Sequence, residues 1–266
     1  MTDNQFNILF ITQDDPFYIK LFFEEFFNNY EDLSNIKALV ISKTMGDENF
    51  ADVIKRFYNF YGFYDFVNMG IRYAFCKGMN YLSRTFRLQK FYSIERLCDF
   101  HHIPVIHHNN INDEHFLEDI KPYSLDLIIS VAAPVIFKKD IINLPQFGCI
   151  NIHHAKLPRY RGMMPNFWQM YHGNNTVGIT IHTINPKIDD GEIILQREVE
   201  IQRQESLDSL IKRTKKIGAA LMIEAIASIK KGNIAFLPND SSQASYYSFP
   251  TRDDVKKFKA QGYKLL

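Results

Sequence analysis

Cysteines, long apolar stretches and a targeting segment are scarce or missing in this 266-residue sequence. Its three cysteines, Cys76, Cys98 and Cys149, are an odd number without the spacing of metal ligands, which argues against a disulfide framework or a zinc site. No apolar run approaches the roughly 20 residues that a membrane span requires. The N-terminal residues show neither the basic region nor the apolar stretch of a signal peptide. We therefore expect a soluble, cytoplasmic protein.

An excess of charge of one sign is also missing. The chain has 31 Lys and Arg residues against 30 Asp and Glu residues, a net charge of +1. A protein dedicated to nucleic acid is usually strongly basic, so this balance argues against a DNA partner. Hydrophobic residues make up 46% of the chain, and a chain of this length can bury a sizeable core.

Short apolar runs alternate with stretches of helical spacing along the chain. The pattern predicts strands at 6–11, 36–42, 105–106, 125–131, 148–153, 178–184 and 193–201. It predicts helices at 16–29, 93–102, 139–143 and 206–231, with a short one at 253–261. Strands that alternate with helices in this order favour an α/β fold, with a mostly parallel sheet covered by helices on both faces.

Polar residues end one of these predicted strands and could carry chemistry. Asn151 and His153 point to the same side of the strand at 148–153, at the carboxyl end where open α/β sheets place their ligand crevice. Asp189 and Asp190 lie in a second turn, where a carboxylate could return to the imidazole. An amide, an imidazole and a carboxylate are the groups that acyl transfer to an amine needs. Each has a plainer reading as a turn contact, a structural histidine or an ordinary turn.

Three separated motifs together resemble the formyltransferase superfamily. They are Asn151-Ile-His153 with Leu157-Pro158, Tyr160-Arg161-Gly162 and Pro165, then Gly178-x-Thr180, then Ile188-Asp189-x-Gly191. The resemblance covers residues 125–200 without gaps and implies a Rossmann-like fold. It also implies transfer of a formyl group from 10-formyltetrahydrofolate to a primary amine, without a metal.

The resemblance also implies roles for individual residues. It implies that Asn151, His153 and Asp189 are catalytic. Asp190 follows the motif's aspartate position by one residue and is therefore not the catalytic carboxylate. It implies that the folate donor is bound by Val131, Ala132, Ala133, Pro134, Val135, Ile136, Ile188 and Asp190. It implies that the acceptor is bound by Lys156, Tyr160, Arg161, Gly162 and His182.

The acceptor expected from the sequence is a nucleotide-linked amino sugar. Only 65 residues follow Ile201, fewer than the C-terminal RNA-binding domain of a typical methionyl-tRNA formyltransferase would need, so tRNA is not the expected acceptor. Ala155-Lys156 replaces the Ser-Leu that commonly precedes Leu-Pro in the family, which adds a cation near the acceptor. The alternatives are a shortened methionyl-tRNA formyltransferase, a formyltetrahydrofolate hydrolase and a catalytically silent scaffold.

A basic and aromatic segment interrupts the N-terminal half. Residues 55–90 hold seven Lys and Arg residues, one acidic residue and many closely spaced aromatics. We expect a helical insertion, at about 52–92, within a catalytic domain at 1–205, and a C-terminal helix and tail at 206–266 packed on that domain. The insertion could be a buried subdomain, a homodimer face, a peripheral contact with anionic lipid or an RNA-binding surface. Its aromatics should pack against the protein or a second subunit.

Overall fold

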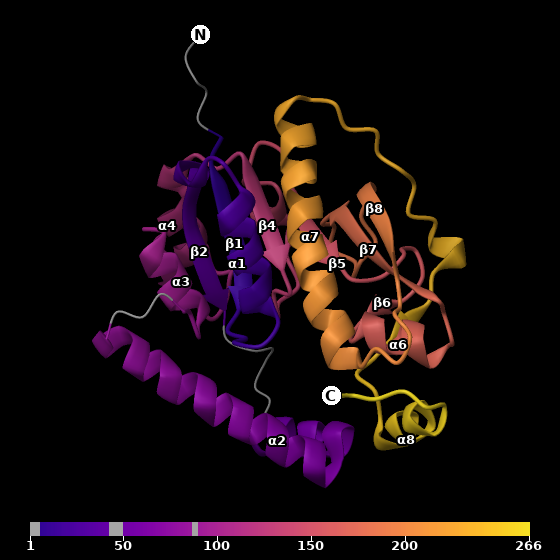
Figure 1. Ribbon diagram of the computed structural model, residues 1–266. Helices are drawn as coiled ribbons and strands as arrows, with labels where there is room; N and C mark the ends of the chain where they lie inside the picture. Colours follow the sequence, from indigo (N-terminus) through magenta and orange to yellow (C-terminus); the bar gives the residue numbers. More distant parts are fainter. Residues whose placement is uncertain (1–5, 43–49, 87–89) are drawn as a thin grey trace.

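A seven-stranded sheet lies between helices in the computed structural model, which describes residues 6–42, 50–86 and 90–266 (Figure 1). The strand order is β3-β2-β1-β4-β5-β7-β8. The first five strands in this order are parallel, and β7 runs antiparallel to both of its neighbours, β5 and β8. The bounds are β1 Ile8–Gln13, β2 Ile36–Ser42, β3 Val105–His107, β4 Leu127–Val131, β5 Cys149–His153, β7 Thr176–Thr183 and β8 Ile193–Glu200. The expected α/β fold with a mostly parallel sheet is confirmed.

Alternation along the strands divides the core into two hydrophobic clusters. Ile8 and Phe10 of β1 pack with α1 (Ile19–Asn29), α3 (Ile94–Phe100) and α7 (Leu207–Lys230) on one face. Leu9 and Ile11 pack with α4 (Glu114–Ile120) and α5 (Lys139–Ile142) on the other face. Successive side chains of a strand point to opposite faces, so both faces must be covered to bury such continuous apolar runs. In Figure 1, α1 and α7 lie side by side in front of the sheet.

Local chemistry explains where two helices begin. Ser93 caps α3, because its hydroxyl accepts a hydrogen bond from the Arg96 amide. The first helix begins at Ile19, three residues later than the expected start at 16. The Asp15 carboxylate accepts hydrogen bonds from the Phe17 and Tyr18 amides, at 2.6 and 2.9 Å, which holds this stretch as a turn.

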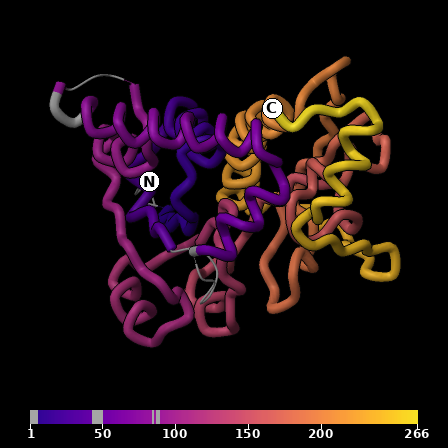
Figure 2. Tube along the Cα trace, turned by 90° about the horizontal axis from the view of Figure 1, so that it is seen from below, coloured from indigo at the N-terminus to yellow at the C-terminus, as the bar shows by residue number. Residues whose placement is uncertain are grey.

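The segment at 55–90 is helical, as expected. It forms most of α2 (Phe50–Phe86), which is broken at Gly62, where φ is +73°. Figure 2 shows α2 as a long bent coil beside the C-terminal part of the chain. Phe60 is buried against Phe167 and Phe249, but most other aromatics of α2 are exposed within this single chain. Residues 87–89 of the segment lie outside the described residues.

The C-terminal part of the chain lies against the sequence around residue 161. Strand β9 (Tyr246–Tyr247) pairs in parallel with β6 (Arg161–Gly162). Helix α8 (Arg252–Ala260) contacts α2 and α6 (Pro165–Tyr171), a helix that the sequence analysis did not predict. The remaining elements are short 3-10 turns at Leu33–Asn35, Lys121–Tyr123 and Ser241–Gln243. The tail is therefore part of the framework around the candidate site.

Candidate active site

Strands β5 and β7 bring an amide and an imidazole face to face. Asn151 on β5 lies directly opposite His182 on β7 in the antiparallel ladder, and Asn151 Nδ2 lies 3.2 Å from His182 Nε2. Nδ1 of His182 lies 2.8 Å from the carbonyl oxygen of Thr183, so Nδ1 carries the proton and donates. With the proton on Nδ1, Nε2 accepts from the Asn151 amide, and the same Nε2 lies 3.6 Å from Oδ1 of Asp189. The contact with His182 fixes which way the amide of Asn151 points.

His153, two residues further along β5, lies between two oxygen atoms. Its Nε2 is 2.7 Å from the carbonyl oxygen of Tyr160, and its Nδ1 is 3.5 Å from Oδ2 of Asp189. The side chains of His153 and Asp189 are only 7% and 11% exposed. The structure therefore brings together the three residues that the sequence motif predicts as catalytic.

Burial and charge set the ionisation of this pair. Burial lowers the pKa of His153, and the facing carboxylate of Asp189 opposes that shift only in part. Burial raises the pKa of Asp189, but His153, His182 and the Gly162 amide outweigh it and hold this pKa well below its usual range. The free site thus holds a carboxylate beside a neutral imidazole at neutral pH. Such an imidazole can take up a proton when negative charge develops next to it.

The turn that carries Asp189 is held from two sides. The Gly162 amide donates to Oδ2 of Asp189 at 2.9 Å. The side-chain amide of Asn239 donates to the carbonyl oxygens of Asp189 and Gly191, each at 2.9 Å. A Cβ atom at Gly191 would lie 1.7 Å from the Thr183 carbonyl oxygen, so the turn can approach β7 this closely only with glycine there.

The neighbouring carboxylate, Asp190, has different partners. Its Oδ1 lies 2.5 Å from Nη1 of Arg161 and accepts from the Ser241 hydroxyl at 2.5 Å. Arg161 also donates to Oδ1 of Asn239 at 2.9 Å. The Ser241 hydroxyl and the guanidinium lower the pKa of Asp190, so the carboxylate is charged. Asp190 and Arg161, which the sequence assigned to the donor and the acceptor, are bound to each other and to the tail.

The residues assigned to the folate donor follow the neighbouring strand. Val131 ends β4, and its carbonyl oxygen accepts from the Thr12 hydroxyl at 2.8 Å. One residue earlier, Ser130 pairs with Asn151 of β5, so the loop from Ala132 begins beside the amide. Asn112 holds the loop by donating to the Ile136 carbonyl oxygen at 2.9 Å. Ala132, Ala133, Pro134 and Val135 are partly or fully buried, whereas Ile136 and Ile188 are exposed. A loop with partly accessible apolar side chains beside Asn151 suits a flat heteroaromatic ring.

The residues assigned to the acceptor differ in how their side chains are engaged. Lys156 is exposed and paired with Glu198. The Tyr160 ring stacks on Tyr247 with centroids 5.5 Å apart, and its hydroxyl accepts from Asn174 at 3.0 Å. These contacts turn the Tyr160 ring toward the tail. The backbone carbonyl oxygen of Tyr160 remains in contact with the His153 imidazole.

The position of His154 just after a strand predicts a surface or helix-flanking residue, and this prediction is wrong because His154 is buried. It follows His153 but points to the other side of the sheet, because alternate residues of a strand face opposite ways. A Cβ atom at Gly218 of α7 would lie 3.2 Å from its ring. Both ring nitrogens are buried without a hydrogen-bond partner, and burial holds the pKa of His154 well below its usual value.

Other residues of the site could not be predicted from the sequence, because they lie far along the chain from the motifs they contact. Asn239 and Ser241 hold the Asp189 turn from about 50 residues away, and no local motif marks them. Lys215 of α7 is buried near His153 and His154, and burial lowers its pKa to about 8 against the opposing charge of Asp15. An unexpected Lys at an otherwise apolar helix position is the one signal that the sequence offers.

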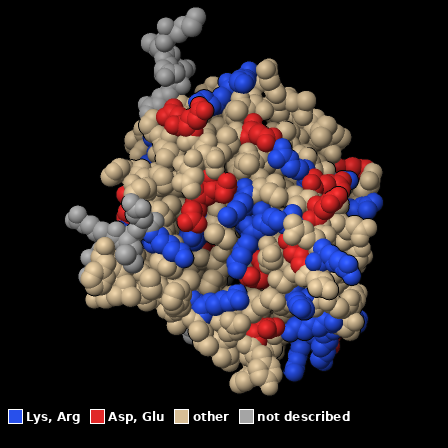
Figure 3. Space-filling model, in the orientation of Figure 1, with Lys and Arg blue, Asp and Glu red and all other residues tan. Residues whose placement is uncertain are grey.

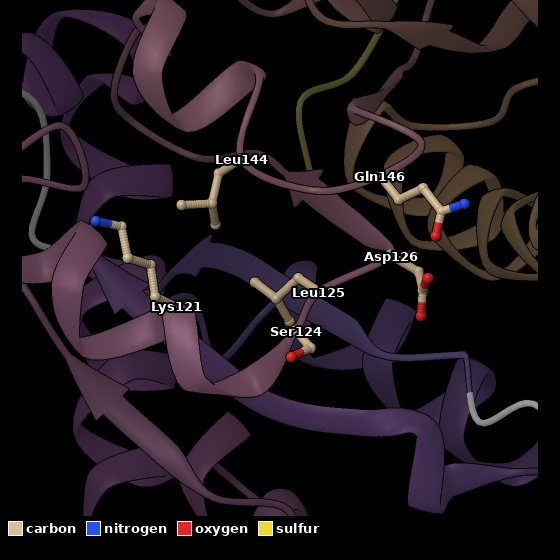
Figure 4. Close-up of a pocket in the computed structure, with 6 residues that line it drawn as sticks. All are labelled: Lys121, Ser124, Leu125, Asp126, Leu144 and Gln146. Atoms are coloured by element: carbon tan, nitrogen blue, oxygen red, sulfur yellow. The ribbon is translucent and has the colours of Figure 1, made fainter.

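Other features of the described residues do not compete with this site. A surface cavity of about 480 Å³ lies at the amino ends of β4 and β5, the opposite end of the strands from His153 (Figure 4). Its Asp126 carboxylate already accepts from the Asn7 amide at 2.7 Å. Within the described ranges, no group of three or more His, Cys, Asp or Glu side chains is placed to hold a metal ion. No helix there is long and apolar enough to cross a membrane.

Sequence comparison relates the chain to one family. A family model described as formyl transferase matches residues 83–226, more than half of the chain. The chain belongs to the formyl transferase family. It is 35% identical over 153 residues to a methionyl-tRNA formyltransferase of Alkaliphilus oremlandii, which covers 58% of this chain and 49% of that protein. A methionyl-tRNA formyltransferase of Thermotoga maritima is 31% identical over 162 residues, which is 61% of this chain and 52% of that protein. The chain therefore matches about half the length of these curated relatives.

Solved structures of formyltransferases share the fold. A glycinamide ribonucleotide transformylase from Symbiobacterium toebii matches with a TM-score of 0.61 and 14% identity, over 90% of this chain and 93% of that one. A sugar N-formyltransferase from a Shewanella species matches with a TM-score of 0.58 and 17% identity, over 96% of this chain and 88% of that one. At these identities the likeness concerns the fold, which agrees with the Rossmann-like expectation.

Proposed function

We propose that this protein transfers a formyl group from 10-formyltetrahydrofolate to the primary amine of a small acceptor. The observation that carries the proposal is the meeting of Asn151, His153 and Asp189 at the carboxyl ends of the strands, in a chain of the formyl transferase family. Packing alone does not require three polar side chains there, which speaks against a catalytically silent scaffold.

The proposed chemistry uses the three residues in different ways. The amine nitrogen of the acceptor attacks the formyl carbon, and a tetrahedral intermediate with a negative oxygen forms. The Asn151 amide and the His153 imidazole stabilise that oxygen, for which Nε2 of His153 exchanges the Tyr160 carbonyl oxygen for the oxyanion. Asp189 holds the imidazole at Nδ1 as it becomes positively charged. The amine then loses a proton to water, and the bond between the formyl carbon and the folate nitrogen breaks as that nitrogen is protonated. One such donor is worth about 3 kcal/mol of barrier.

The donor and metal assignments belong to the same proposal. The loop at 131–136 lies beside Asn151 and provides apolar surface for a pterin. Ile188, which directly precedes Asp189 in the chain, is exposed and adds to that surface. Structures similar in fold include a sugar 3N-formyltransferase in the presence of dTDP and 5-N-formyl-THF, and a Helicobacter canadensis N-formyltransferase in complex with folinic acid. No metal ion takes part in the proposed steps. We further propose that residues 1–205 form the catalytic domain and that 206–266 pack on it.

The proposed acceptor is a nucleotide-linked amino sugar. The Helicobacter canadensis enzyme is described in complex with dTDP-3-aminofucose, which shows that this acceptor class occurs among proteins of similar fold. The front of the molecule carries cations and anions side by side, without the continuous basic surface that tRNA binding would favour (Figure 3). Near the site, Arg161 and Lys156 are both paired with carboxylates. A second candidate acceptor is methionyl-tRNA, because the relatives at 35% and 31% identity are methionyl-tRNA formyltransferases.

An acceptor panel tests the proposal directly. The purified protein would be incubated with 10-formyltetrahydrofolate and, in parallel, with dTDP- and UDP-linked amino sugars, glycinamide ribonucleotide and methionyl-tRNA. We expect a mass gain of one formyl group on an amino sugar. Equal or faster formylation of methionyl-tRNA would overturn the acceptor assignment, and formate release without an acceptor would identify a hydrolase. His153→Ala serves as the inactive control.

A further inference from the structure

Helix α2 leaves a large apolar face uncovered in the single chain. Beyond Gly62, nine large apolar side chains of its outer part, residues 63–86, are 42% to 85% exposed: Phe63, Tyr64, Val67, Ile71, Tyr73, Phe75, Tyr81, Leu82 and Phe86. At about 200 Å² for a large side chain, the six that share one side of the helix expose on the order of 700 Å². They are Tyr64, Val67, Ile71, Phe75, Leu82 and Phe86. Monomeric proteins rarely expose more than a few hundred Å² of contiguous apolar surface, so this face is suited to a partner.

Six of these nine residues fall, with Gly78, on one side of a straight helix, whereas Phe63, Tyr73 and Tyr81 lie off that side. Tyr64, Val67, Ile71, Phe75, Gly78, Leu82 and Phe86 follow one another at intervals of 3, 4, 4, 3, 4 and 4. This 11-residue repeat corresponds to about 3.67 residues per turn, close to the period of an α-helix. The face therefore extends along the whole outer helix, and a second straight helix could follow it without strong supercoiling.

Two glycines of this face have no role within the chain. Gly70 and Gly78 are exposed, and a Cβ atom at either position would meet nothing within 4 Å. Glycine inside a helix costs about 1 kcal/mol relative to alanine, and nothing in the chain compensates for that cost at these positions. With Ala74 midway between them, the two glycines form a small-residue line where another helix backbone could approach closely.

We propose that this face binds the same face of a second copy of the protein, with the two outer helices antiparallel. Gly70 and Gly78 lie four residues on either side of Ala74, so a two-fold axis at Ala74 would bring each glycine against the other glycine of the second copy. Such self-complementarity is what a symmetric dimer requires. The exposed area is also close to the roughly 800 Å² that each partner contributes to a standard interface.

Charge favours a second copy over a lipid surface. Interfacial helices bind anionic lipid through Lys and Arg that flank the apolar face. Among the cations of α2, Arg72 lies 3.8 Å from Asp208 and Lys77 lies 3.5 Å from Asp14, so these two are engaged with carboxylates of their own chain. The area at the lower left of the molecule, where α2 runs in Figure 1, is mainly uncharged in Figure 3. Glycines would also contribute nothing to lipid insertion, whereas larger apolar residues would.

Sedimentation velocity of the full chain tests the proposal. We expect the wild type to sediment as a dimer at micromolar concentration, and Ala74→Arg to raise the dimer dissociation constant at least about 30-fold. The matched control is Phe236→Arg, which replaces another exposed apolar residue outside α2 and should leave the dimer intact. Circular dichroism would verify that both variants are folded. A monomeric wild type at tens of micromolar, or a dimer that survives Ala74→Arg, would overturn the proposal.

Disulfide formation tests the antiparallel arrangement separately. In a Cys76→Ser background, Ala74→Cys should give a covalent dimer under mild oxidation, because the two introduced thiols would meet at the axis. Leu82→Cys should not, because the second Leu82 would lie far along the antiparallel helix. Rapid cross-linking of Leu82→Cys but not of Ala74→Cys would exclude this geometry. Co-sedimentation of a monomeric wild type with phosphatidylglycerol vesicles would show instead that lipid occupies the face.

Discussion

Asp189 and Asp190 are adjacent in one turn, but their carboxylates serve different parts of the molecule. Oδ2 of Asp189 lies 3.5 Å from the His153 imidazole and accepts from the Gly162 amide. Asp190 instead binds Arg161 and Ser241. One turn therefore provides a charge for the site with its first carboxylate and a connection to the tail with its second.

This division of roles predicts that two conservative substitutions lower kcat to very different degrees. Asp189→Asn removes the charge that stabilises a protonated His153, so kcat for formyl transfer should fall at least about 100-fold. Asp190→Asn leaves the Arg161 guanidinium without its ionic partner, so we expect a loss of about 1–3 kcal/mol in the free energy of unfolding. Its effect on kcat should be smaller than about 10-fold. Steady-state kinetics and urea unfolding measure both quantities, and equal kinetic losses would contradict this division of roles between the two carboxylates.

A second prediction concerns the amide and its partner. Asn151→Ala removes a proposed donor to the oxyanion, and kcat should fall about 100- to 1,000-fold. His182→Ala leaves the amide in place but frees its orientation, so a loss of about 10-fold is expected. His182 Nε2 also lies 3.6 Å from Oδ1 of Asp189. We expect the contact with Asn151 to matter more for kcat, so the double variant should be no slower than Asn151→Ala alone. Additive losses in this cycle would mean that His182 acts through Asp189 or contacts the substrate itself.

The strands and the long helix can be predicted from the sequence because the spacing of apolar residues that marks them is a local pattern. The strand at 36–42 has the bounds of β2, and the helix expected at 206–231 is α7 within one residue at each end, since long apolar periodicity dominates both. Helix α6 escaped prediction because its seven residues are nearly all buried, which leaves no polar face to reveal the period. The start of α1 was displaced because the Asp15 side chain competes with helix formation.

For the site, the sequence predicts which residue types are present and which of them share one side of a strand. It does not predict their long-range contacts. Asn151 and His153 follow from the period of a strand, but the pairing of Asn151 with His182 depends on a ladder register that no local motif encodes. Likewise, the support that Asn239 gives to the Asp189 turn depends on the path of the tail. The sequence pattern thus identifies the chemical groups of the site, and long-range packing determines how their side chains are oriented.

Acid should destabilise the folded protein through its buried histidines. Burial holds the pKa of His154 well below, and that of His153 below, the value of about 6.5 found in an unfolded chain. The unfolded state then binds more protons than the folded state, so stability is lost as pH falls below about 6.5. The depressed pKa of Asp189 acts in the same direction at lower pH. Each histidine contributes up to about 1.4 kcal/mol per pH unit in this range.

His154→Leu isolates this contribution, because His154 is buried without a partner and lies outside the proposed catalytic group. We expect urea unfolding between pH 7.5 and 5.5 to show a weaker pH dependence in the variant than in the wild type. Parallel curves for wild type and His154→Leu would show that folding does not shift the pKa of His154.

The last prediction concerns Gly191, which touches no proposed reactant. A methyl group at this position would lie 1.7 Å from the Thr183 carbonyl oxygen, and that atom belongs to β7 and cannot move freely. Gly191→Ala must therefore push the turn away from the strand, which displaces Asp189 from His153 and costs about 2–4 kcal/mol of stability. Both Tm and kcat should fall, with kcat reduced about as far as in Asp189→Asn. Unchanged values of Tm and kcat in Gly191→Ala would show that the close approach of this turn to β7 does not position the carboxylate.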